Sequence, residues 1–129
     1  MKTFIISILA LLLTVASNQS YTGKWVYFNE EYGQDLVLDL IQKDSSVTGK
    51  HSAVMLNGNR IDDSGEAISI RGTIENNKLI VKVKSGYGDG EPGTAKISFV
   101  GQDSIYFEFI TPPSGEYWIP NKVTLTRKK

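Results

Sequence analysis

The chain has a single histidine, and its surroundings are the first place where chemistry could reside. His51 shares one face of an alternating segment with Gly49 and Ala53, small residues that would leave room beside it inside a barrel. There the imidazole could hydrogen-bond a ligand. A lone histidine is weak evidence for such a role, and we favour a structural or merely exposed histidine. Zinc requires several His or Cys ligands, so no metal site is predicted.

A second group with chemical potential is a cluster of acidic residues. Asp62, Asp63 and Glu66 lie close together in a polar stretch, as in a calcium-binding loop. The oxygen spacing does not match an EF-hand, because Ile61 and Gly65 stand at the wrong positions. We therefore expect a solvated turn here.

No catalytic set is evident. The sequence has one His, no Cys and no Gly-x-Ser-x-Gly motif. The glycine-rich stretch at residues 86–93 has neither a following helix nor a lysine at phosphate-binding spacing. A carboxylate pair for glycoside hydrolysis remains open, because neighbouring strands can bring two acids together. We expect a protein that is not an enzyme and that uses no cofactor.

Residues 1–20 have the pattern of a secretory signal peptide. A basic second residue precedes an apolar run over residues 4–13, and cleavage after Ala16, Ser17 or Ser20 is open. The run is shorter than the ~20 residues of a membrane span, and no Cys is present for a lipoprotein anchor. We expect a secreted or periplasmic protein with no stable membrane anchor after cleavage. The alternative is an uncleaved anchor.

The charge balance excludes some partners. The chain has 14 basic and 14 acidic residues, and removal of Lys2 with the leader leaves 14 − 1 = 13 basic ones. A net charge near −1 offers no surface for nucleic acid or anionic membrane. Without Cys there is no disulfide, so stability must come from the core and the strand ladder.

Alternation of apolar and polar residues predicts strands throughout residues 21–129, which we expect to form a single domain. The expected strands cover residues 22–28, 35–42, 47–56, 66–74, 78–84, 94–100, 104–110 and 116–127. Residues 57–65 are expected to be a long polar connection. About eight strands at hairpin spacing predict an all-β protein with an antiparallel up-and-down β-barrel. A two-sheet β-sandwich is the alternative.

The inward-facing residues follow from the alternation. We predict the following set: Trp25, Tyr27, Leu36, Leu38, Leu40, His51, Ala53, Met55, Ile68, Ile70, Leu79, Val81, Val83, Ala95, Ile97, Phe99, Ile105, Phe107, Phe109, Val123 and Leu125. Those that could line a ligand-binding lumen are Tyr27, Leu38, His51, Ala53, Phe99 and Phe107.

The segment Gly23-Lys24-Trp25 resembles the opening of calycin barrels, the superfamily of lipocalins, fatty-acid-binding proteins and avidins. The resemblance implies that Arg127, near the end of the last strand, packs over Trp25 and closes one end of the barrel. The chain has no equivalent of the lipocalin C-terminal helix or of the helix pair of fatty-acid-binding proteins. It has only two Trp residues, whereas avidins surround biotin with several.

Two functions are consistent with these observations. The first is an exported barrel that binds a small, mostly apolar molecule in its lumen. The alternative is a protein-binding module, such as an inhibitor of a secreted hydrolase, that acts through loops at residues 57–65, 85–93 and 112–117. The candidate residues for contact with an extracytoplasmic protein are Asn59, Arg60, Asp62, Tyr87, Asp89, Tyr117 and Trp118. A barrel filled by its own side chains would favour the second function.

Overall fold

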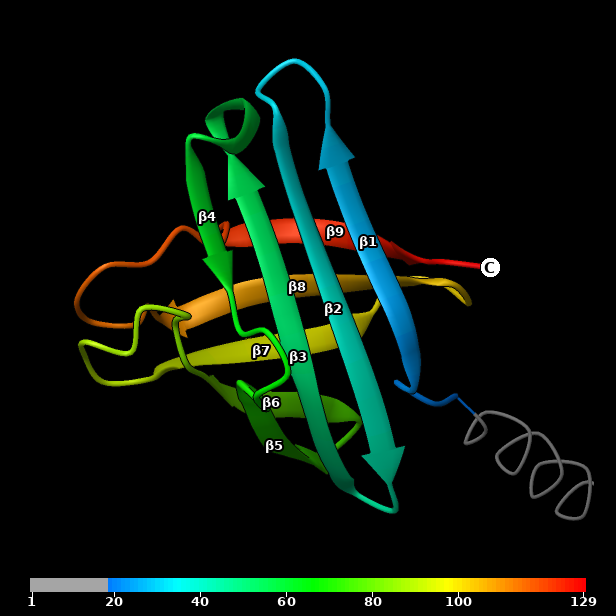
Figure 1. The fold of residues 1–129 in the computed structure, drawn as a ribbon. Helices are drawn as coiled ribbons and strands as arrows, with labels where there is room; N and C mark the ends of the chain where they lie inside the picture. Colours follow the sequence, from blue (N-terminus) through cyan, green and yellow to red (C-terminus); the bar gives the residue numbers. More distant parts are fainter. Residues whose placement is uncertain (1–18) are drawn as a thin grey trace, which may run out of the picture.

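The computed structural model describes residues 19–129, which fold into strands connected by turns (Figure 1). The predicted signal peptide lies outside the described residues, apart from its last two positions. The only helical element from residue 19 onward is one 3-10 turn, η1 Leu56–Gly58. The strands are β1 Gly23–Asn29, β2 Gln34–Lys43, β3 Ser46–Met55, β4 Arg60–Asp63, β5 Ile70–Glu75, β6 Lys78–Val83, β7 Gly93–Phe99, β8 Ser104–Thr111 and β9 Lys122–Arg127.

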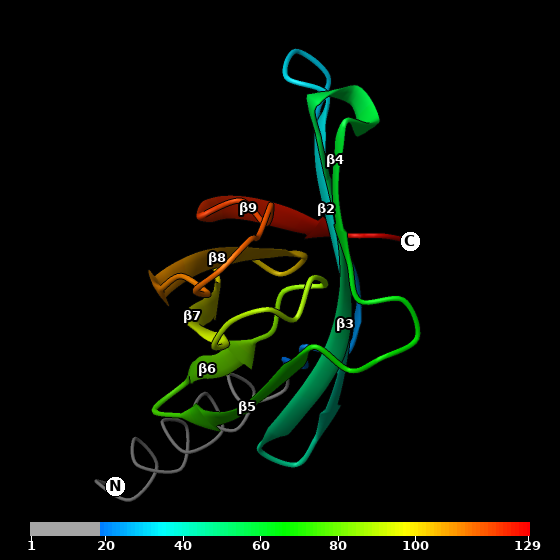
Figure 2. The same ribbon diagram turned by 60° about the vertical axis from the view of Figure 1, so that its left-hand side comes forward.

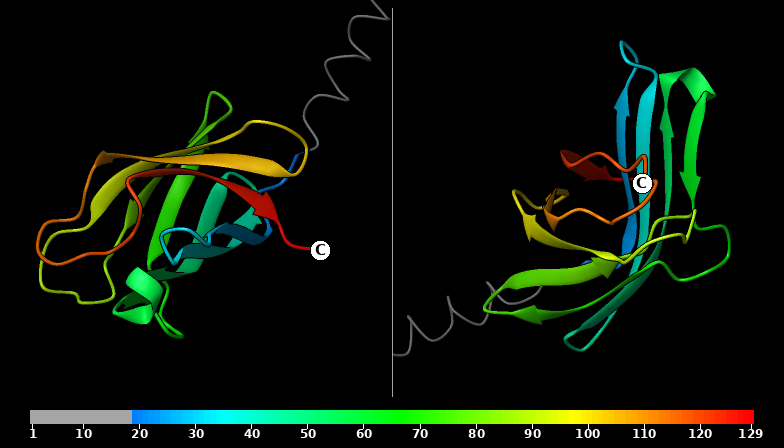
Figure 3. Two further views of the ribbon diagram at one scale, coloured as in Figure 1. Left: turned by 90° about the horizontal axis from the view of Figure 1, so that it is seen from above. Right: turned by 90° about the vertical axis from the view of Figure 1, so that its left-hand side faces the viewer.

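Eight of the nine strands form a closed antiparallel barrel. Each strand of the ring pairs with the next along the chain, and β9 returns to pair with β1. The ninth strand, β4, lies outside the ring against β3. Figure 1 shows strands β1–β4 crossing the strands behind them at a steep angle, and the right-hand view of Figure 3 shows these two groups of strands from the side. The predicted all-β, eight-stranded antiparallel barrel is confirmed, and the chain does not adopt the sandwich alternative.

β3 changes its partner halfway along its length. Residues 46–49 pair with β5, whereas residues 52–55 pair with β4. His51 lies at the change, where its backbone carbonyl accepts a hydrogen bond from the Ser64 N–H at 3.0 Å. Polar side chains of Ser64 and Ser69 form hydrogen bonds with His51 at this position.

The barrel interior is filled by apolar side chains. Alternate residues of every ring strand point inward and are buried, as the period of a strand requires. The buried set comprises Trp25, Leu36, Leu38, Leu40, Val47, Ala53, Ile70, Leu79, Val81, Val83, Ala95, Ile97, Ile105, Phe107, Phe109, Val123 and Leu125. In a chain without disulfides, this burial is the main source of stability.

Trp25 and Arg127 meet at one end of the barrel. The Arg127 guanidinium carbon lies 4.2 Å from the Trp25 ring centroid, in the arrangement that the calycin resemblance implied. The Trp25 indole N–H donates to the Tyr21 carbonyl at 2.9 Å. A Cβ at Gly23 would lie 2.8 Å from Arg127 Nη1, on a backbone with φ of 145°. Glycine at the start of the Gly-x-Trp segment therefore makes room for the guanidinium.

The expected connection at residues 57–65 is wrong, because it contains β4. The Asn-Gly pair lies in the 3-10 turn η1, and Arg60–Asp63 then run back along β3. The four residues of β4 include three charged side chains. Such residues are depleted in strands generally, although an edge strand outside the ring accepts them.

Two other expected strands are too long. The strand expected at residues 66–74 begins only at Ile70, and Ile68, predicted to face inward, is 43% exposed. The chain enters β5 only after Ser69, whose N–H donates to the Gly49 carbonyl at 2.9 Å. The strand expected at residues 116–127 begins only at Lys122, which follows Pro120 and its missing N–H donor.

Candidate functional site

A buried carboxylate joins four parts of the chain that are far apart in sequence. Asp62, on β4, is 1% exposed. Its Oδ1 atom accepts hydrogen bonds from His51 Nε2 at 2.8 Å and from the Gly86 N–H at 2.6 Å. Its Oδ2 atom accepts from the Ser85 hydroxyl at 3.1 Å and from the Trp118 N–H at 3.0 Å. Asp62 thus binds β3, the loop after β6 and the loop after β8 to β4.

His51 connects this carboxylate to a second buried hydroxyl. Its Nδ1 atom lies 2.7 Å from the Ser69 hydroxyl oxygen. Because an ionised carboxylate only accepts hydrogen bonds, the Nε2 atom donates to Asp62 and Nδ1 is free to accept from Ser69. His51 and Ser69 are both buried, so the imidazole has a partner at each nitrogen.

Ser85 extends the same network to the loop after β8. Its hydroxyl also lies 2.7 Å from the Glu116 carbonyl oxygen, and it accepts a hydrogen bond from the Tyr87 N–H at 3.2 Å. Gly86 packs directly on β4, where a Cβ would lie 2.4 Å from the Asp63 carbonyl oxygen. Only glycine allows this close approach.

The electrostatics of Asp62 favour its charged form. Burial alone would raise its pKa, but the hydrogen bonds from His51, Trp118 and Gly86 outweigh that effect. The pKa of Asp62 is therefore below its ordinary value. The carboxylate remains ionised and can hold its donors at all but strongly acidic pH.

Ser69, His51 and Asp62 are the residue types of a serine hydrolase triad, but the geometry assigns them another role. All three side chains are buried, and the Asp62 carboxylate also accepts hydrogen bonds from two backbone N–H groups and a hydroxyl. A nucleophile must reach a substrate carbonyl, and Ser69 faces the imidazole inside the barrel wall. The network holds loops in place.

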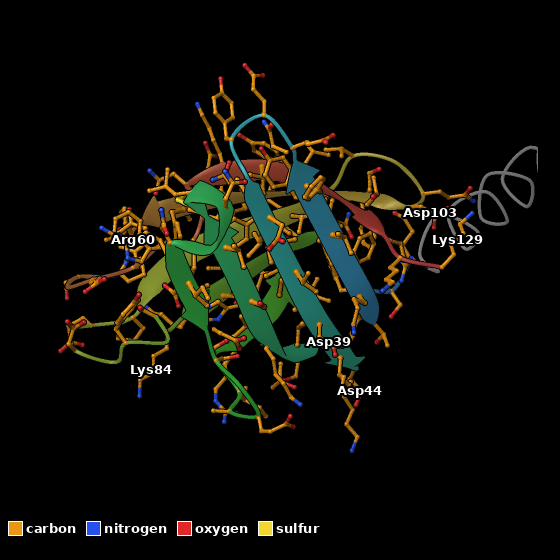
Figure 4. The ribbon with its side chains drawn as sticks, turned by 45° about the horizontal axis from the view of Figure 1, so that its top comes forward. Asp39, Asp44, Arg60, Lys84, Asp103 and Lys129 are labelled. Atoms are coloured by element: carbon orange, nitrogen blue, oxygen red, sulfur yellow. The ribbon has the colours of Figure 1, made fainter. Side chains whose placement is uncertain are left out.

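The loops held by Asp62 form one continuous surface, here called the loop junction: β4, residues 84–92 and residues 112–121. The Arg60 guanidinium carbon lies 5.3 Å from the Trp118 ring centroid. The Tyr87 hydroxyl donates to the Ile61 carbonyl at 2.8 Å. Ile61 is 52% exposed and Tyr87 43%. Figure 4 shows Arg60 and Lys84 on the same side of the barrel, opposite Asp103 and Lys129.

Three polar contacts fix the outer parts of the loop junction. The Glu116 N–H donates to Asp89 Oδ1 at 3.2 Å, and the Trp118 indole N–H donates to Glu116 Oε2 at 2.9 Å. The Tyr117 hydroxyl donates to Asn121 Oδ1 at 2.9 Å. The loops after β6 and β8 are therefore joined to each other as well as to β4.

A cleft of about 500 Å³ adjoins the loop junction. It lies between the ends of β1 and β3 and the segment that leads into β9. It is lined by Tyr27, Gln34, Met55, Tyr117, Trp118, Ile119, Pro120, Asn121, Lys122 and Val123.

The structure separates the predicted lumen residues into two groups. Leu38, His51, Ala53 and Phe107 are at most 2% exposed within the filled interior. Tyr27 is partly buried and reaches the cleft, with its hydroxyl 3.3 Å from Gln34 Oε1. Phe99 is partly buried near the other end, where it stacks on Tyr21 with ring centroids 4.3 Å apart.

The predicted partner residues come together in the loop junction, with one correction. Arg60, Tyr87 and Asp89 are exposed, and exposed Asn59 lies beside them in the turn before β4. Tyr117 and Trp118 are partly buried in the loop after β8. Asp62 was expected in a solvated turn and as a contact for a partner, but its side chain is fully enclosed by its hydrogen-bond donors.

Ser69 and Ser85 complete the network, and sequence reasoning missed both. Ser85 continues the inward alternation of Leu79, Val81 and Val83, which is a signal that could have placed it at the core. Ser69 offers no such signal, since it precedes β5.

Among residues 19–129, no group of three or more His, Cys, Asp or Glu side chains is arranged to hold a metal ion. The same part of the chain contains no helix with the length and apolar character needed to cross a membrane. Comparison of the chain with protein-family models, with curated proteins and with solved structures found no match.

Proposed function

We propose that this chain is a protein-binding module that acts through the loop junction. The observation that carries the proposal is the buried Asp62 carboxylate, which fixes β4 and two loops in one arrangement. A protein surface that is ordered before binding loses less conformational entropy on association. By fixing the loops before a partner binds, the Asp62 network lowers the entropic cost of association.

The composition of the loop junction also supports this proposal. Trp, Tyr and Arg are the residues most enriched at binding hot spots. The loop junction presents Trp118, Tyr87 and Arg60 together, with exposed Ile61 between them. Glu116 and Asp89 form an acidic rim beside these aromatic groups. The partner is an extracytoplasmic protein, and a secreted hydrolase inhibited by this chain is one example.

The competing function, a small apolar ligand in the lumen, has less support. A lumen that held a ligand would leave its lining accessible to water, yet Leu38, Ala53 and Phe107 are at most 1% exposed. A ligand would have to displace packed side chains, which protein interiors resist. This function remains a sequence-based prediction.

Export and calycin kinship are part of the proposal. Arg127 donates to the Ser20 carbonyl at 3.0 Å, and the Gln19 amide lies 3.3 Å from the Gly101 carbonyl oxygen. Cleavage after Ser17 would leave both contacts intact, and the mass of the mature protein tests that site. Kinship with calycins rests on Trp25 stacked beneath Arg127 in an eight-stranded barrel.

The test is chemical cross-linking of the purified protein in the extracytoplasmic fraction of its source, followed by mass spectrometry. The double variant Arg60→Ala/Trp118→Ala removes the hot-spot pair. The matched control is Arg71→Ala/Tyr106→Ala, which removes the same kinds of side chain from the outer faces of β5 and β8. We expect the captured amount of one protein to fall at least about tenfold with Arg60→Ala/Trp118→Ala and to stay unchanged with the control. Equal capture by both double variants would reject the proposal.

A further inference from the structure

Strands β1 and β9 close the barrel over only part of their lengths. They are paired at Trp25–Arg127 and Val26–Thr126, while β1 continues to Asn29 along β2 and β9 begins at Lys122 along β8. Residues 27–29 and 122–125 therefore diverge and leave a wedge between two strand edges. Figure 2 shows the β1–β2 turn and η1 extending well beyond β9 at this end.

The hydrogen-bond pattern shows which backbone groups face the wedge. The Lys128 N–H donates to the Lys24 carbonyl, so even-numbered residues of β1 point their backbone groups toward β9. The next such residue after Val26 is Phe28. The Phe109 N–H donates to the carbonyl of Asn121, the residue before β9. Odd-numbered residues of β9 therefore face β8, and even-numbered Thr124 faces the wedge.

Phe28 and Thr124 are the residues where the barrel ladder is left open. The register of β1 and β9 would pair them, but in the described residues the pairing ends at Val26–Thr126. Both residues are exposed. Each therefore offers an N–H and a C=O at a strand edge, which is the template for an added strand.

Side chains beside the wedge complement this backbone edge. The cleft of about 500 Å³ lies on the inward side of β1, the side to which Tyr27 points. It combines Tyr27, Met55, Tyr117 and Ile119 with one charged residue, Lys122. A strand added to β1 would point alternate side chains into this cleft.

We propose that the wedge receives an extended peptide segment of the partner protein, which adds to the free edge of β1. The inference rests on the proposed function and specifies how the partner binds. The segment places a bulky apolar side chain in the cleft and an acidic residue beside Lys122, the single charge among the cleft residues. Its backbone pairs with the N–H and C=O of Phe28.

A library of linear 12-residue peptides displayed on phage is the probe, selected on the mature protein. We expect recovered peptides to share a bulky apolar residue and an acidic residue. The deciding variant is Phe28→Pro, which removes the edge N–H without breaking the β1–β2 ladder, because Phe28 does not bond to β2. The matched control, Phe28→Ala, keeps the N–H and removes the ring.

Peptide affinity should fall about tenfold or more with Phe28→Pro and much less with Phe28→Ala. If the Phe28→Pro variant fails to fold, a second measurement on the unchanged protein tests the same point. Hydrogen exchange of the Phe28 amide in the unchanged protein should slow when the peptide is added. The neighbouring Tyr27 amide, already bonded to β2, should change little.

Three results would overturn the inference: no peptide enriched above background, peptides insensitive to Phe28→Pro, or an unchanged Phe28 amide on binding. A concentration-dependent dimer that protects this amide without peptide would assign the wedge to a second copy instead. If cross-linked partner capture depends on Arg60 and Trp118 but not on Phe28→Pro, the wedge inference fails while the proposed function stands.

Discussion

Removal of the Asp62 carboxylate should both destabilise the protein and release its loops. In Asp62→Ala, four hydrogen bonds disappear at once. The Gly86 and Trp118 N–H groups and His51 Nε2 lose their acceptor. The Ser85 hydroxyl keeps the Glu116 carbonyl as a partner. The variant therefore leaves three donors in search of partners.

The size of the effect follows from these three groups. An unsatisfied buried donor costs about 1–3 kcal/mol, so three such groups would cost about 3–9 kcal/mol if all of them stayed buried. Because water can reach the loop N–H groups once the side chain is gone, we expect a loss of about 3–5 kcal/mol. At about 4 °C per kcal/mol for a domain of this size, the melting temperature should fall by about 12–20 °C.

Thermal and urea unfolding followed by circular dichroism measure this loss. Amide hydrogen exchange should also accelerate at Gly86 and Trp118 more than in the barrel strands. The matched control is Asp63→Ala, because exposed Asp63 makes a side-chain hydrogen bond only to the Gly65 N–H. If Asp62→Ala costs no more than Asp63→Ala, or if the loop amides remain protected, the reasoning about this network is wrong.

Three further predictions concern pH, barrel closure and the core. Because the pKa of Asp62 is lowered in the folded state, its stabilising effect is complete above about pH 4 and is lost as the pH falls through the folded pKa. In urea unfolding, the free energy of unfolding should therefore fall less with decreasing pH in Asp62→Asn than in the unchanged protein. Arg127→Ala should lower the unfolding free energy by about 1–2 kcal/mol, because it removes the cation over Trp25, and an unchanged melting temperature would contradict this. A Cβ at Gly49 would lie 2.5 Å from the Asp39 carbonyl oxygen, whereas a Cβ at Gly101 would meet nothing within 4 Å. Gly49→Ala should therefore lower the free energy of unfolding by about 1–3 kcal/mol. Gly101→Ala should change it little, and thermal unfolding measures both variants.

The barrel could be predicted from the sequence because each of its strands alternates. Leu36, Leu38 and Leu40 define one inward face, and Ile105 and Phe107 another, so strand type and face follow from the period of two. Short turns between these segments then imply hairpins and a meander. Most of the predicted inward set is buried, but Ile68 is exposed because it lies before β5 begins, Tyr27, Met55 and Phe99 are only partly buried, and the set lacks buried Val47.

The candidate site was harder to predict because its central residue breaks the usual rule for charges. Acidic residues are almost never fully buried unless they are paired, so Asp62 in a polar stretch was interpreted as solvated. Its partners, His51 and Ser85, come from segments 11 and 23 residues away. No local pattern brings them together. They lie close together only because residues 60–63 form β4, an edge strand that its polar sequence did not predict.

The network lies where β3 changes its partner. A barrel strand normally satisfies its backbone groups with two continuous neighbours. At His51 one neighbour ends and another begins, and Ser64 and Ser69 supply the local hydrogen bonds. Asp62 and His51 fill the interior at this point with polar groups that are satisfied. The same arrangement positions the loop junction.

Native mass spectrometry of the mature protein, purified gently from its own source, tests the central claim most directly. We predict the mass of the polypeptide alone or of its complex with a second protein, because the barrel is filled and the loop junction is the binding surface. A stoichiometric small-molecule adduct of defined mass, retained by the Arg60→Ala/Trp118→Ala variant, would contradict the account and return the function to the lumen.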